Sequence, residues 1–175
     1  MSGNLKWQKL NIFGYRMILI SHRGNLEGKN PEKENSPIYV LQALSKGFDV
    51  EVDVWYLEGK WFLGHDEPQY ETDLDFLKAS SHSLWCHAKN IQALKMMLKE
   101  DIHCFWHQDD DVTLTSRGYI WTYPGKNLTE KSICVFPEQF EEIYNKSMGI
   151  DNCYGICSDY IVWEGLLWME NKEKN

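Results

Sequence analysis

The sequence predicts a single α/β domain that spans residues 1–175 and is built on a mainly parallel sheet. Short apolar runs, typical of buried strands, alternate along the chain with stretches whose apolar residues recur at helical spacing. Of the 175 residues, 43% are apolar and 14% are aromatic, which is enough for one hydrophobic core. These proportions exclude an intrinsically disordered chain.

The first strand and the first helix are predicted from their ends as well as from their apolar residues. Met17–Ser21 is an apolar run that ends at the polar residue His22. After a polar loop, Ser36 is a good N-cap for a helix over Pro37–Lys46, and Gly47 follows its end. We therefore expect a buried strand followed by a helix.

The next segment predicts a strand with one acidic face and one apolar face. Phe48–Trp55 alternates strictly, so that Glu51 and Asp53 share the acidic face. A turn at Glu58-Gly59 then predicts a hairpin whose returning strand is Trp61–Asp66.

The rest of the chain continues the alternation of strands and helices. Helices are expected over 74–79, 91–99, 137–148 and 161–169, and strands over 84–88, 102–107, 119–123, 132–136 and 154–158. With 17–22 and 49–55, these make seven strands of parallel type. The last helix is strongly apolar, which favours packing in the core over the alternative of a dimer contact; the oligomeric state stays open.

The charge of the chain limits its partners. There are 18 Lys and Arg residues against 26 Asp and Glu residues, a net charge of −8. An acidic surface repels nucleic acid, so we expect no nucleic-acid partner. An anionic substrate would need a few positioned cations or a metal ion. No run reaches the roughly 18 apolar residues of a membrane span.

The five cysteines predict buried, reduced thiols. Their number is odd, and three of them lie inside apolar strand-like runs. The segment Met1–Arg16 contains no apolar stretch of signal-peptide length. We therefore expect a cytoplasmic location.

The two carboxylates Glu51 and Asp53 allow two interpretations. If they lie side by side in a buried site, they repel each other, and a divalent cation such as Mg²⁺ or Ca²⁺ would relieve that repulsion. If the strand is an exposed edge, the two residues form a solvated acidic face. Their spacing alone does not separate these possibilities.

Further titratable residues follow the predicted strands. His22 and His65 each come at the end of a strand, and a pair of histidines can divide the work of a general base and a general acid. Arg23 offers a planar fork suited to phosphate, and Lys89 offers a point charge. Because the carboxyl ends of parallel strands form one edge, these groups are suited to metal-assisted phosphoester chemistry.

Four motifs in this order resemble those of the glycerophosphodiester phosphodiesterases. They are His22-Arg23-Gly24, Glu34-Asn35, Glu51-Val52-Asp53-Val54 and Gly64-His65-Asp66, and weaker similarity continues at Lys89, Trp121-Thr122 and Ser158-Asp159-Tyr160. The resemblance covers residues 17–66 well and the remainder loosely. It implies the TIM-type (β/α) barrel that this family shares with the phosphatidylinositol-specific phospholipases C.

The resemblance also implies a role for each matched residue. His22 and His65 would be the acid/base pair, and Glu51 and Asp53 would hold the metal ion. Arg23, Lys89 and Trp121 would contact the substrate, and Glu34 would anchor the site through hydrogen bonds. The implied activity is metal-dependent hydrolysis of a small glycerophosphodiester-like substrate.

One departure from the family bears on the metal ion. Where the family usually has a glutamate ligand, two residues before the matching lysine, this chain has His87. An imidazole in place of a carboxylate weakens Mg²⁺ or Ca²⁺ and favours Mn²⁺ or Zn²⁺. A weakened barrel that binds phosphorylated ligands without turnover is therefore the alternative to an enzyme, and an interaction protein with a solvated acidic face is the third possibility.

The length predicts an incomplete barrel. A (β/α)₈ barrel typically needs about 200–250 residues, and this chain has 175. Between residues 107 and 132 there is little room for full helices. We expect a compact barrel whose second half has shortened or missing helices, or lacks a strand.

Overall fold

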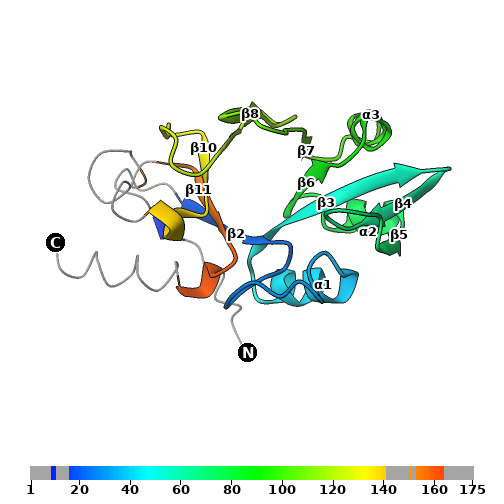
Figure 1. Cartoon of the computed structure of the whole chain (residues 1–175), viewed down its shortest axis with the longest axis horizontal. Helices are drawn as coiled ribbons and strands as arrows, with labels where there is room; N and C mark the ends of the chain where they lie inside the picture. The colour runs from blue at the N-terminus through cyan, green and yellow to red at the C-terminus, as the bar shows by residue number, and fades with distance from the viewer. Residues whose placement is uncertain (1–8, 11–15, 141–149, 151–152, 164–175) are drawn as a thin grey trace.

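A computed structural model describes residues 9–10, 16–140, 150 and 153–163, which form one mixed sheet of eleven strands with short helices beside it (Figure 1). The strands are β1 (Lys9–Leu10), β2 (Arg16–His22), β3 (Asp49–Leu57), β4 (Lys60–Leu63), β5 (Tyr70–Thr72), β6 (Leu84–Ala88), β7 (Cys104–Phe105), β8 (Val112–Leu114), β9 (Ile120–Thr122), β10 (Ser132–Val135) and β11 (Gly155–Ser158). The helices are α1 (Pro37–Ser45), α2 (Leu74–Ala79), α3 (Ile91–Lys99) and the 3₁₀ helix η1 (Pro137–Phe140).

The centre of the sheet is a curled row of parallel strands. In space their order is β9, β10, β11, β2, β3, β6 and β7. Strands β4 and β5 continue antiparallel from the far part of β3, and β8 runs antiparallel to β9. Because β11 pairs with β2, the beginning and the end of the described chain lie side by side. Among the described residues no ladder joins β7 to β9, so the sheet is an open, curled half-barrel (Figure 1).

The predicted TIM-type barrel is therefore wrong. In the described part of the chain, three short α-helices and one 3₁₀ helix have both ends described, and strands and helices do not alternate regularly. Between β7 and β10 the chain forms the short strands β8 and β9 and no helix. The physical reason is that this segment is rich in residues that favour turns and lacks apolar residues at helical spacing.

The elements around the first helix confirm the prediction from capping residues. Helix α1 begins after Ser36, whose side chain accepts a hydrogen bond from Tyr39 N, and Gly47 after its end has a φ of 90°. Helices α2 and α3 have the predicted bounds. The hairpin between β3 and β4 turns at Glu58-Gly59, where both residues have positive φ.

Several boundaries differ from the prediction. Strand β4 ends at Leu63, so His65 lies in the loop that follows it. The strand expected over 102–107 is reduced to β7, and the edge strands β5 and β8 were not predicted. Of the helices expected over 137–148 and 161–169, η1 and the helical residues 161–163 are described, and the remaining residues of both lie outside the described part.

The two faces of the curled sheet carry different side chains. The apolar face of β3, with Val50, Val52 and Val54, belongs to the larger core cluster, which also includes buried residues of α1, α2 and α3. The opposite face carries a smaller cluster: Ile20, Trp85, Phe105, Trp121, Ile133, Val135 and Cys157. Because side chains alternate along a strand, the same face continues into polar residues at the carboxyl ends of the strands.

The cysteines agree with the sequence-based prediction of buried thiols. All five lie in the described part of the chain, are buried, and form no disulfide. None of the helices described has both the length and the apolar character needed to cross a bilayer.

Candidate functional site

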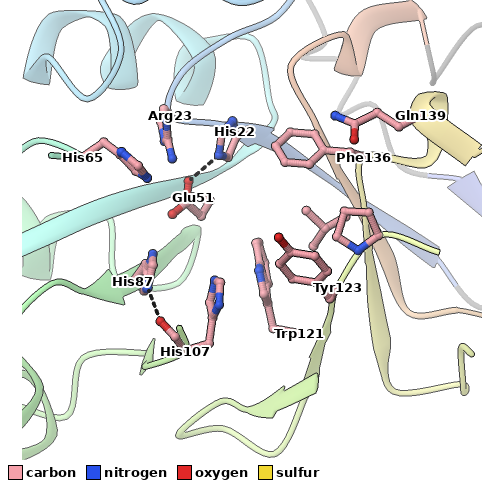
Figure 2. A pocket seen from close by; sticks show the side chains of 12 residues that line it. His22, Arg23, Glu51, His65, His87, His107, Trp121, Tyr123, Phe136 and Gln139 are labelled. Atoms are coloured by element: carbon pink, nitrogen blue, oxygen red, sulfur yellow. Dashed lines mark hydrogen bonds and ion pairs between the residues drawn. The ribbon is translucent and has the colours of Figure 1, made fainter. Parts of the chain in front are cut away.

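A cavity of about 310 Å³ opens at the carboxyl ends of the parallel strands. Figure 2 shows Arg23, His65 and Glu51 on one side of this cavity, with Tyr123 and Phe136 across from them. Its lining consists of His22, Arg23, Glu51, His65, His87, His107, Trp121, Tyr123, Pro124, Val135, Phe136 and Gln139. Six of the nine predicted site residues therefore line one cavity: His22, Arg23, Glu51, His65, His87 and Trp121.

The register of the parallel strands explains why these residues meet. His22 of β2 lies opposite Glu51 of β3, and Asp53 of β3 lies opposite His87 of β6. His22 Nε2 is 3.7 Å from Glu51 Oε2, as the dashed line in Figure 2 marks. Strand β3 is thus an interior strand, and Glu51 and Asp53 are 3% and 0% exposed. The interpretation of these two residues as a solvated acidic face is wrong.

Asp53 is surrounded by positively charged or donating groups. Its Oδ2 accepts a hydrogen bond from Asn35 Nδ2 at 2.9 Å and lies 2.9 Å from Arg23 Nε. Its Oδ1 lies 3.1 Å from His87 Nδ1 and 3.5 Å from Lys89 Nζ. Burial alone would raise the pKa of Asp53, but the contact with His87 and the charge of Arg23 outweigh burial and lower it. Asp53 is therefore a stable carboxylate.

Glu51 has the opposite surroundings. Among the described residues, no group donates a hydrogen bond to its Oε2. Burial and the negative charge of Asp53 raise the pKa of Glu51 well above its usual value. A buried carboxylate oxygen that faces a cavity without a donor is costly, and a cation would satisfy it.

His22 is held by a second carboxylate. Its Nδ1 is 2.7 Å from Oδ1 of Asp159, the residue after β11. The side-chain amide of Asn25, which is fully buried, donates to Asp159 at 2.8 Å and to Glu34 at 2.9 Å. Burial of Asp159 would raise its pKa, but the hydrogen bond from His22 outweighs burial and lowers it.

Glu34 joins this network to the first strand. Its Oε2 accepts a hydrogen bond from Arg23 Nη1 at 3.2 Å, so a continuous set of contacts runs from His22 to Asp53. Burial of Arg23 would lower the pKa of its guanidinium, but the carboxylates of Asp53, Glu51 and Glu34 raise it. Arg23 is a fixed cation at the edge of the cavity.

Three residues of the site have positive φ angles, which residues other than glycine rarely adopt; Arg23 and Phe136 line the cavity, and Asn35 contacts Asp53 behind it. The φ angles of Arg23, Asn35 and Phe136 are 54°, 63° and 49°. Hydrogen bonds compensate for this strain: Arg23 N donates to Glu51 O, and Asn35 N donates to Arg23 O. Such strain is typical of functional sites, because the surrounding structure must stabilise it.

The three other histidines that line the cavity occupy two environments. His65 is half-buried, and its Nδ1 is 2.7 Å from Oδ1 of the exposed Asp66; burial lowers the pKa of His65. The ring of His87 stacks on the ring of His107 at 4.6 Å between centroids, and His87 Nε2 lies 3.4 Å from the carbonyl oxygen of His107 (Figure 2).

Aromatic side chains form the wall of the cavity across from the charged residues. Trp121 is 6% exposed and stacks on Phe105 at 4.6 Å between centroids, across the open seam between β7 and β9. The ring of Phe136 meets the ring of His22 edge-on at 4.7 Å. Tyr123, at 48% exposed, lies at the edge of the cavity. A ligand in the cavity would thus contact charged groups on one side and rings on the other.

The residues present fit a divalent metal ion. Glu51, Asp53 and His87 each offer one ligand atom, and these atoms all lie within 4.8 Å of one another. The independent observation is Glu51 Oε2, which is buried and for which the described residues supply no donor. The ligand set would combine two carboxylate oxygens with one imidazole nitrogen.

Sequence reasoning missed several residues of the site. Asp159 was noted as part of a motif at the last strand but given no role, and Asn25, His107 and Phe136 were not singled out. Asp159 follows the buried strand β11 directly, and His22 is the last residue of β2; a position at the carboxyl end of a strand is a signal that could have identified Asp159. Asn25 is in a loop, and no periodic pattern indicates its burial.

Comparison of the chain with protein-family models, with curated proteins and with solved structures finds no match in any of the three.

Proposed function

We propose that this protein is a metal-dependent phosphodiester hydrolase that acts on a small glycerophosphodiester-like substrate. The observation that carries the proposal is that one cavity is lined by two histidines, a fixed arginine and two members, Glu51 and His87, of a three-residue cluster suited to a metal ion. The motif resemblance to the glycerophosphodiester phosphodiesterases supports the same chemistry. Although the sheet is not the expected barrel, most of the matched residues still lie together at one edge of it.

His22 is the proposed general base. Asp159 contacts its Nδ1, so in this proposal the proton is on that nitrogen and Nε2, which lies 3.7 Å from Glu51 Oε2, is the atom that accepts a proton. Nε2 takes a proton from the attacking oxygen, which belongs to water or to an adjacent hydroxyl of the substrate, as that oxygen forms its bond to phosphorus.

His65 is the proposed general acid. It gives its proton to the leaving alkoxide oxygen as the bond from that oxygen to phosphorus breaks, so an alcohol leaves. The step ends with His22 protonated and His65 neutral, and proton exchange with solvent restores both histidines. Attack by water yields a phosphomonoester directly, whereas attack by a substrate hydroxyl first yields a cyclic phosphate that water then opens. Burial lowers the pKa of His65, which makes its imidazolium a stronger acid.

The cations around Asp53 bind the phosphate. Arg23 lines the cavity and carries further donors beyond the Nε and Nη1 that contact Asp53 and Glu34. Lys89 adds a second positive charge beside Asp53. A divalent ion held by Glu51, Asp53 and His87 would polarise a phosphoryl oxygen and stabilise the charge that develops on it.

The test is turnover of a bis-aryl phosphodiester by the full chain with a divalent ion added. A chelator should abolish turnover, and His22→Ala or His65→Ala should lower kcat by about 10²–10⁴-fold while metal affinity is kept. His82→Ala is the matched control, because His82 is exposed and precedes β6 at the end away from the cavity. Undiminished turnover in chelator, or in His22→Ala, contradicts the proposal.

The same experiment addresses binding without turnover. The observation that favours this alternative is that all four contacts of Asp53 are already made by protein groups. A wild-type protein that binds a phosphomonoester in the cavity but turns over no diester with any divalent ion would support it.

A further inference from the structure

Tyr123 presents an aromatic ring to the cavity without a stacking partner. The residue lines the cavity and is 48% exposed (Figure 2). Among the described residues its one ring contact is with His107, which it meets edge-on at 6.4 Å between centroids. A flat group that stacks on such a ring removes apolar surface of both partners from water.

Main-chain hydrogen bonds hold Tyr123 in place. Its carbonyl oxygen accepts a hydrogen bond from Lys126 N at 3.2 Å across Pro124 and Gly125, and Gly125 has a φ of 79°, which is the signature of a type II turn. Tyr123 N donates to Asp111 O at 2.9 Å, and Lys126 Nζ lies 2.7 Å from Asp111 Oδ1. The ring takes no part in these bonds, so the turn positions an aromatic surface that the fold itself leaves half exposed.

A second ring is placed at the cavity by an unusual backbone conformation. Phe136 has a φ of 49°, and its N donates to Cys157 O at 2.9 Å. Its half-buried ring meets the ring of His22 edge-on at 4.7 Å. Figure 2 shows Phe136 and Tyr123 on the same side of the cavity, across from Arg23. A phosphate bound at Arg23 would therefore have its ester group toward these rings.

The aromatic wall carries no charge. It consists of Trp121, Tyr123, Pro124, Val135, Phe136 and Gln139. Among the described residues that line the cavity, Glu51 alone has a carboxylate, and it lies across from this wall beside Arg23 (Figure 2). An ammonium group placed at the aromatic wall would lose water without gaining a carboxylate partner, which is unfavourable. A neutral group suits this wall better than a cation.

From these observations we infer that the cavity takes a phosphate ester whose alcohol carries a neutral, flat aromatic or heteroaromatic ring, and that Tyr123 selects for this ring by stacking on it. The inference rests on the proposed function, which places the phosphate at Arg23. A cavity of about 310 Å³ is at the small end of small-molecule sites. It has room for a phosphate and one ring beside it, and too little room for a long acyl chain.

The test compares three phosphate monoesters as ligands of the full chain, with a divalent ion added. Phenyl phosphate and cyclohexyl phosphate carry six-carbon rings that differ in flatness, and phosphocholine carries a cation in place of a ring. Calorimetric titration at pH 8, where each phosphate is fully ionised, gives the three dissociation constants. Phenyl phosphate should bind about fivefold more tightly than cyclohexyl phosphate, as expected for one stacked pair of rings of equal area.

Variants of Tyr123 assign the preference to its ring. Tyr123→Leu should remove the preference for phenyl phosphate over cyclohexyl phosphate, and Tyr123→Phe, which keeps the ring, should retain it. Since the turn is held by main-chain groups and the side chain is half exposed, both variants should unfold at the wild-type Tm. Equal affinities for the two ring esters in wild type, a preference that survives in Tyr123→Leu, or tighter binding of phosphocholine than of phenyl phosphate overturns the inference.

Turnover of the bis-aryl phosphodiester separates this inference from the proposed function. If wild type turns over the diester but shows no preference for phenyl phosphate, the inference is wrong and the hydrolase stands. If phenyl phosphate is preferred but no diester is turned over, the ligand class is correct and the hydrolase is wrong. If none of the three esters binds, both are wrong.

Discussion

Glu51 should destabilise the metal-free protein, and replacing it with glutamine should therefore raise stability while abolishing metal binding. The carboxylate is 3% exposed, and among the described residues its Oε2 has no hydrogen-bond donor. Glutamine has almost the same shape and carries no charge. The comparison is made in the presence of a chelator, so that only the protein's own groups act on residue 51.

The direction of the pKa shift determines how this destabilisation depends on pH. Burial and the charge of Asp53 raise the pKa of Glu51 in the folded protein well above the unfolded value of 4.5. The folded state thus binds the proton more tightly, so its advantage is complete below pH 4.5 and is lost as pH rises through the folded pKa. The slope is at most about 1.4 kcal/mol per pH unit. At pH 8 we expect Glu51→Gln to be more stable by about 2 kcal/mol, and for a domain of this size that raises Tm by about 4–8 °C.

The assay is thermal unfolding followed by calorimetry between pH 5 and pH 9 in chelator. The advantage of Glu51→Gln over wild type should grow as the pH rises, and Glu67→Gln, at an exposed glutamate, should match wild type throughout. With a divalent ion at about 100 times its dissociation constant, wild type should gain about 2.7 kcal/mol and the variant much less. A Glu51→Gln protein that is less stable than wild type in chelator at pH 8 would refute the reasoning.

Three further predictions concern other parts of the structure. Asp159→Asn should lower kcat by about 100-fold or more, because His22 loses the carboxylate at its Nδ1, while the affinity for the metal ion stays unchanged. Steady-state kinetics measures kcat and titration calorimetry measures the metal affinity. A loss of metal affinity that matches the loss of kcat would contradict this prediction. Burial lowers the pKa of His103 to about 4 from 6.5, so the folded protein loses stability as the pH falls through this range. Between pH 7 and pH 4, the free energy of unfolding in urea should fall by about 2 kcal/mol less in His103→Phe than in wild type. An equal fall in both proteins would contradict the prediction. Gly155→Ala should lower the free energy of unfolding, measured in urea, by about 2 kcal/mol, because the added Cβ would lie 2.7 Å from the carbonyl oxygen of Ile18, between β11 and β2. An unchanged free energy of unfolding would show that these strands separate easily.

The residues of the site could be predicted from the sequence to the extent that they follow strands. His22 ends an apolar run, and Glu51 and Asp53 alternate with valines, so their placement at one edge needs only the geometry of parallel strands. Which residues touch depends on register, and register is set by pairing between distant segments. The contact of His22 with Asp159 spans 137 positions, and nothing local indicates it.

The fold was less predictable than the site because short edge strands leave little trace in a sequence. Val112 and Leu114 of β8 are 48% and 70% exposed, so the strand shows no buried face to recognise. It pairs with β9 in an antiparallel ladder of three residue pairs. Alternation of strands and helices in the first half therefore suggested a barrel that the second half does not continue.

The candidate site does not depend on a helix between β7 and β10, where the described chain has none, and this explains how the site can form in an open sheet. The residues that hold its geometry come from β2 and the loop that follows it, from β3 and β6, and from the end of β11; these strands are consecutive parallel neighbours on the closed side of the curl. The seam between β7 and β9 contributes only rings: Phe105 packs on Trp121 where a ladder would otherwise run. A ladder fixes strands by directional hydrogen bonds, whereas ring packing tolerates small shifts. The charged side of the cavity is thus held rigidly, and the aromatic side is the part of the wall that can adapt to a ligand.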